Sequence, residues 1–124
     1  MVQTDLSQLT AECTDWRQIL RNYREEFHQF QKLLQQTCSP SLSKQQMQQV
    51  EHLENQLHIQ LINIHDLKQE IKNHERTVQL QGDNITEQTY ADHEHLLSEF
   101  ISLEHTLQEL RGEFNAFVNE TACV

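Results

Sequence analysis

Residues 6–34 read LSQLTAECTDWRQILRNYREEFHQFQKLL, and this stretch decides the fold class. Its apolar positions alternate between steps of three and four residues, as the a and d positions of a heptad do. They are Leu6, Leu9, Cys13, Trp16, Leu20, Tyr23, Phe27, Phe30 and Leu34. An unbroken stripe of this length predicts a long amphipathic helix whose aromatic side chains pack in a core.

The same repeat occurs in two further segments of the chain. In the second segment the residues that recur every seven positions are Val50, Leu57, Ile64, Ile71 and Val78. Leu53 and Leu67 occupy d positions and Leu61 an e position, while Gln60 and His74 interrupt the d row. The third carries Leu96, Phe100, Leu103, Leu107, Leu110, Phe114 and Phe117, and the pattern extends back to His93 at an a position. Three helices are therefore predicted, each with an apolar stripe to bury.

Two breaks separate the repeats. Pro40 prevents the first helix from continuing, and Ser43 with Gln46 predicts a capping box at the next helix start. Gly82 suits a helix C-terminus, and Asn84 with a glutamate three residues later predicts another capping box.

Short connections between long helices favour antiparallel neighbours. The sequence therefore predicts an all-α fold, an up-down-up antiparallel three-helix bundle or coiled coil with long helices. We expect one domain over residues 1–124, with helices at about residues 5–37, 43–81 and 84–118.

Composition excludes several classes of function. Nine basic against nineteen acidic residues give a net charge of −10, which disfavours binding to nucleic acid or to an anionic membrane. There is no run of about 18 apolar residues and no secretory h-region, so we expect a cytoplasmic protein with reduced cysteines. Helices packed without glycine-rich loops offer no concave catalytic pocket. We therefore expect no enzyme activity, no cofactor and no small-molecule substrate.

Two resemblances can be stated. The three-helix heptad layout, with Trp16 in the first helix, resembles a spectrin-type repeat. Residues 50–75, which include INIHDLKQEIK at residues 62–72, are similar to a group of small uncharacterised coiled-coil proteins from Bacteroidetes-type bacteria. That group has no known activity, so the resemblance implies a bacterial cytoplasmic origin and assigns no functional residues.

Two histidines occupy predicted core positions at similar heights above the Gly82 turn. These are His74 and His93, and Cys13 lies within about a heptad of the same layer. A His-His-Cys cluster could bind a divalent metal ion. The alternative, which we favour from the sequence alone, is a polar layer of neutral imidazoles and water that fixes the helix register.

The predicted surface offers two further features. Ile59, Ile62 and Ile101 fall at outward heptad positions, which suggests an isologous homodimer, although scattered exposed aliphatic residues are the alternative. From residue 83 onward there are nine acidic residues and one base, so this face could dock a basic protein partner. Glu99 is expected to pair with Arg17.

The remaining cysteines, Cys38 and Cys123, are expected at the same end of the bundle, as free thiols or as a disulfide switch. Taken together, the sequence predicts a non-catalytic structural or protein–protein interaction module that self-associates. The alternatives are a metal-binding or sensor bundle using the His/Cys cluster and an acidic adaptor that docks a basic partner.

Overall fold

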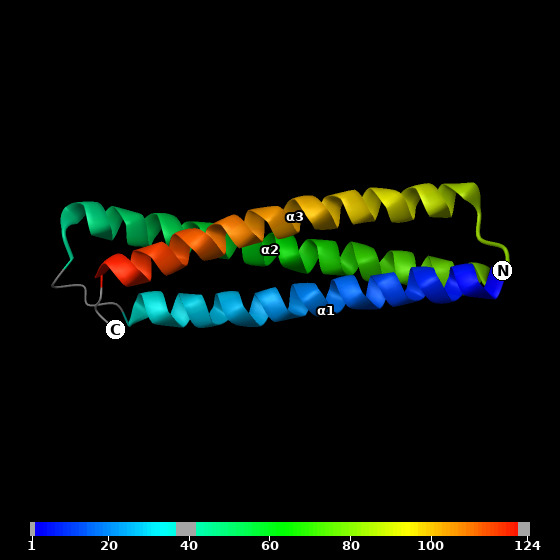
Figure 1. Cartoon of the computed structure of the whole chain (residues 1–124), viewed down its shortest axis with the longest axis horizontal. Helices are drawn as coiled ribbons and strands as arrows, with labels where there is room; N and C mark the ends of the chain where they lie inside the picture. Colours follow the sequence, from blue (N-terminus) through cyan, green and yellow to red (C-terminus); the bar gives the residue numbers. More distant parts are fainter. Residues whose placement is uncertain (1, 37–41, 122–124) are drawn as a thin grey trace.

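The computed structural model describes residues 2–36 and 42–121, and within them the chain forms three long α-helices. These are α1 (Val2–Gln35), α2 (Lys44–Gln81) and α3 (Glu87–Thr121). They lie side by side along one axis, with α1 and α3 parallel to each other and α2 antiparallel to both (Figure 1). The predicted up-down-up, all-α three-helix bundle is confirmed.

The buried side chains follow the heptad positions closely. In α1, every predicted a and d residue after Leu6 is buried. In α2 and α3 the same rows supply most of the core, together with the polar residues Gln60, Thr89 and the two histidines. Rings from parallel helices meet directly: Phe30 stacks on Phe114 with centroids 4.0 Å apart. The core therefore runs the length of the bundle.

Two caps define the ends of α2. Ser43 accepts a hydrogen bond from the Gln46 backbone N–H at 3.1 Å, and the Gln46 side chain accepts one from the Ser43 N–H at 2.9 Å. The predicted capping box is thus confirmed. At the other end Gly82 has φ 55°, a conformation that glycine adopts without a steric penalty, and its N–H donates to Val78 O at 3.2 Å.

The start of α3 differs from the prediction. Asn84 does not cap the helix, because Thr86 takes that role: its Oγ1 accepts from the Thr89 backbone N–H at 3.2 Å. The buried Thr89 hydroxyl in turn donates to Gln81 Oε1 at 2.8 Å. This link to the end of α2 makes Glu87 the first helical residue and extends the connection beyond Asn84.

The partner of Arg17 also differs from the prediction. It pairs with Glu75 of α2 at 2.7 Å and not with Glu99, which instead accepts from His95 at 2.8 Å. Glu75 is buried, so its carboxylate requires a nearby cation more than the partly exposed Glu99 does. Arg17 therefore joins α1 to α2 and does not cross to α3.

A further ion pair links the parallel helices α1 and α3. Arg111 donates through two guanidinium nitrogens to Glu26 Oε1, at 3.0 and 2.7 Å, and its guanidinium carbon lies 4.8 Å from the centroid of the Tyr23 ring. This contact fixes the relative height of the two helices. No helix in the described part of the chain is long and apolar enough to cross a membrane.

The burial of the core residues predicts that the same leucine-to-alanine change has very different effects at two positions of α2. Leu57→Ala, at a side chain with no solvent exposure, should lower the free energy of unfolding by about 2–5 kcal/mol. Leu80→Ala, at a side chain 81% exposed, should change it by less than about 0.5 kcal/mol. Urea titrations followed by circular dichroism measure both values, and equal losses would contradict the assignment of the core.

Candidate metal centre

Three side chains that can bind a metal ion converge in the core, and each comes from a different helix. Cys13 lies on α1, His74 on α2 and His93 on α3, with one donor atom from each within 4.8 Å of the others. Their exposed fractions are 0%, 8% and 2%. The two histidines meet because they stand at matching distances from the α2–α3 turn, and Cys13 reaches them from the N-terminal half of α1.

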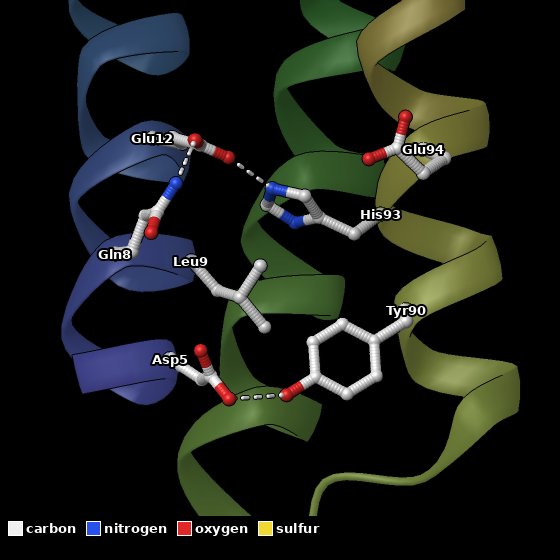
Figure 2. A pocket seen from close by; sticks show the side chains of 7 residues that line it. All are labelled: Asp5, Gln8, Leu9, Glu12, Tyr90, His93 and Glu94. Carbon is white, nitrogen blue, oxygen red and sulfur yellow. Dashed lines mark hydrogen bonds and ion pairs between the residues drawn. The ribbon is translucent and has the colours of Figure 1, made fainter. Parts of the chain in front are cut away.

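The imidazoles form a hydrogen-bonded chain that ends on a carboxylate. His74 Nε2 and His93 Nδ1 are 2.9 Å apart, and His93 Nε2 lies 2.6 Å from Glu12 Oε1. Gln8 donates to the other oxygen of Glu12 at 3.3 Å. Figure 2 shows Glu12 reaching from α1 toward the ring of His93, with Gln8 below it on the same helix. Both imidazoles are thus bonded within the protein, as a polar core layer requires.

Burial keeps the Cys13 thiol and the His74 ring neutral. The pKa of the Cys13 thiol is raised to about 12, mainly by burial and then by the charge of Glu75, with Arg17 opposing them. The pKa of His74 is lowered by burial and by the neighbouring His93, against the opposing charge of Asp92. At neutral pH the site therefore presents a thiol and an uncharged His74 ring.

Two surface hollows flank the histidine pair. One lies between α1 and α3, and its lining residues are Asp5, Gln8, Leu9, Glu12, Tyr90, His93 and Glu94 (Figure 2). The other lies between α2 and α3, where His74 and Leu96 are accompanied by Glu70, Asn73, Thr77, Asp92, His95 and Glu99. Each lining contains three carboxylates and no lysine or arginine, so the electrostatic surroundings favour a cation over an anion.

Two residues of this centre could not be anticipated from the heptad pattern. Glu12 and Glu75 lie next to Cys13 and His74 in the sequence but outside the a and d rows. Glu12 contacts His93, whereas Glu75 pairs with Arg17 and accepts a longer bond of 3.4 Å from Thr14. In the sequence, only their position next to Cys13 and His74 indicates that they belong to this centre.

The predicted surface isoleucines lie on the outside of the bundle. Ile59, Ile62 and Ile101 are exposed by 38%, 48% and 57%, on α2 and α3, as their outward heptad positions predict. The exposed histidines His95 and His105 pair with glutamates one turn away, which is ordinary helix-surface behaviour. Cys38 and Cys123 lie outside the described residues.

Comparisons with protein-family models, with curated proteins and with solved structures give no match to this chain. The resemblances to a spectrin-type repeat and to a bacterial coiled-coil group therefore stay predictions.

The lowered pKa of His74 predicts a pH dependence of stability. The unfolded chain takes up a proton at His74 near pH 6.5, before the folded protein does, so protonation favours unfolding as the pH falls. The stabilising contribution is complete above that pH and is lost below it. We expect the free energy of unfolding to decrease from about pH 7.5 to about pH 5.5.

His74→Gln provides the matched control for this pH effect. The amide retains a donor toward His93 but does not titrate, so the decrease in stability should be smaller in the variant. Urea titrations at the two pH values measure the difference. Identical pH dependence in the two proteins would show that His74 is not held neutral by the fold.

Proposed function

We propose that this protein is a non-catalytic helical bundle that binds one transition-metal ion through Cys13, His74 and His93. The observation that carries the proposal is that each helix contributes one buried donor to the same small volume. A bound ion would cross-link all three helices near the end where α2 turns into α3. Metal binding would therefore be linked to the packing of this end, as a structural or sensor role requires.

The donor set and the spacing support an ion of the zinc class. Thiolate sulfur and imidazole nitrogen bind Zn²⁺ and Co²⁺ well, whereas Mg²⁺ and Ca²⁺ prefer oxygen. Zn–N distances of about 2.0–2.1 Å place two nitrogens of a tetrahedral site about 3.3 Å apart. The His74–His93 nitrogens start at 2.9 Å, so they would separate by a few tenths of an ångström.

Cys13 would complete the site by moving slightly toward the imidazoles. A Zn–S distance of about 2.3 Å places sulfur about 3.6 Å from each nitrogen, compared with the present limit of 4.8 Å. On binding, the thiol proton would leave to solvent, and the proton of the His74 nitrogen that binds the ion would transfer to its other nitrogen. Three protein donors leave a fourth position for water.

Metal titration tests this proposal. Untagged protein should bind one equivalent of Co²⁺ and develop a sulfur-to-cobalt charge-transfer band, and Zn²⁺ should displace the cobalt and raise Tm. Cys13→Ser should abolish the band, and His93→Gln should weaken binding strongly. His105→Gln removes an exposed histidine from the same chain and should change neither result.

The proposal would be wrong if untagged wild-type protein bound no metal at one equivalent. It would also be wrong if His105→Gln weakened binding as much as His93→Gln does, because that would indicate surface coordination.

A second candidate function is self-association through the outer faces of α2 and α3. Ile62 and Ile101 are exposed by 48% and 57% amid a largely polar surface, and Ile59 lies on the same helix as Ile62. An isologous dimer would remove these aliphatic side chains from water. This candidate is independent of the metal site, since the residues are outside the core.

Ile62→Glu should then shift the protein from dimer to monomer, because a charge would be buried without a partner at the interface. Sedimentation equilibrium over a range of concentrations measures the shift. Leu80→Glu introduces the same charge at another exposed aliphatic residue near the end of α2 and should leave the dimer intact. A wild-type protein that is monomeric at high concentration removes this candidate.

A further inference from the structure

Glu12 lies on the far side of His93 from the proposed ion and makes the shortest hydrogen bond at the centre. Its Oε1 is 2.6 Å from His93 Nε2, whereas His93 Nδ1 faces His74. We propose that Glu12 is a positioning residue: its carboxylate holds His93 in the tautomer protonated on Nε2, so that Nδ1 is the atom that binds the metal ion. The second half of this statement rests on the proposed function.

Which ring nitrogens carry protons, from Glu12 through His93 to His74, follows from what each group can donate. An ionised carboxylate only accepts hydrogen bonds, so the proton between Glu12 and His93 belongs to His93 Nε2. When the His93 ring carries a single proton, that proton lies on Nε2, and Nδ1 keeps its lone pair. That lone pair must accept from His74, which places the second proton on His74 Nε2. One carboxylate on α1 thus sets the tautomers of two histidines on the other two helices.

This arrangement prepares His93 for a metal ion in the apoprotein. In metal-binding histidines, the N–H of the second ring nitrogen commonly donates a hydrogen bond to a carboxylate, which fixes the ring orientation and increases the basicity of the ligand nitrogen. Here the bond is already made, and the ring is further held by Trp16, whose centroid lies 4.8 Å from that of His93. His93 would therefore need no ring flip and no tautomer change to bind the ion.

Glu12 itself is not assigned as a metal ligand. Glu12 Oε1 contacts His93 Nε2, whereas His93 Nδ1 faces His74. The imidazole ring therefore stands between the Glu12 carboxylate and His74. Figure 2 shows Glu12 reaching one edge of the His93 ring from α1, and both residues line the same hollow.

The chain offers a matched control for Glu12. Glu94 lines the same hollow, carries the same charge, and makes no hydrogen bond to His93 in Figure 2, where both residues are drawn. Glu12→Ala and Glu94→Ala therefore remove equal charge from the same hollow, but only the first removes the bond to the ring. Glu12→Gln adds an intermediate case, because the amide oxygen still accepts but carries no charge.

The first experiment uses the metal-free protein. Nitrogen-15 NMR of the imidazoles should show His93 protonated on Nε2 and unprotonated on Nδ1 in the wild type and in Glu94→Ala. Glu12→Ala should give a mixture of tautomers for His93, and Glu12→Gln a smaller change. Wild-type His93 protonated on Nδ1 would overturn the assignment.

The second experiment measures the Kd for Zn²⁺ by competition with a chromophoric chelator. Glu12→Ala should weaken binding by about 10–100-fold, the usual effect of removing such a carboxylate. Glu94→Ala should cause only a small change, and Glu12→Gln should lie between them. Circular dichroism of each variant checks that the helices are retained.

The outcomes separate this inference from the proposed function. If wild-type protein binds no Zn²⁺, the metal site is wrong and Glu12 positions no ligand, whatever tautomer the NMR spectra give. If wild-type protein binds Zn²⁺ but Glu12→Ala and Glu94→Ala weaken it equally, the metal site stands and the role of Glu12 is overturned.

Discussion

The structure depends on burying three apolar stripes against one another along the whole length of the helices. Each stripe belongs to a helix of 34 to 38 residues, too amphipathic to be stable alone in water but long enough to contribute many large side chains. Because the stripes are continuous, a slip of one helix by a turn would leave core residues unpaired at both ends. Stacked rings such as Phe30 on Phe114 make such a slip costly.

The two ends of this core differ chemically. Toward the end of the bundle where α1 and α3 both terminate, the interior is aromatic and aliphatic, with Phe27, Phe114 and Phe117 buried. Toward the α2–α3 turn, the heptad rows carry His74, Thr89 and His93 among apolar residues such as Val78 and Leu96. A polar layer contributes less hydrophobic stabilisation than aliphatic side chains would, but its hydrogen bonds can be satisfied in only one alignment of the helices. The polar residues near the α2–α3 turn thus specify the alignment of the helices, whereas the apolar core supplies most of the stability.

The sequence was sufficient for most of the fold and for part of the centre, for a common reason. Heptad position determines burial, so the core and the convergence of His74 and His93 could be derived by counting from the Gly82 turn. Residues beside the stripe are different, because their partners depend on side-chain reach and helix rotation. Arg17 therefore pairs with Glu75 and not with Glu99, and the contact of Glu12 with His93 was not predicted. The cap of α3 was assigned wrongly to Asn84 because Asn84 and Thr86 are both suitable capping residues. The hydrogen bond from the Thr89 hydroxyl to Gln81 favours Thr86.

The apoprotein geometry also bears on what kind of metal site this would be. In small domains that have little core, the ion supplies the folding free energy, and the metal-free chain is unfolded. Here the apolar core extends far beyond the cluster. His74 and His93 are hydrogen-bonded to each other, and His93 is also bonded to Glu12. Loss of the metal would leave no buried imidazole unpaired, so both forms can be folded. If the proposed site binds an ion, its imidazoles would have partners both with the ion and without it, and such a site would suit reversible binding better than permanent structural reinforcement.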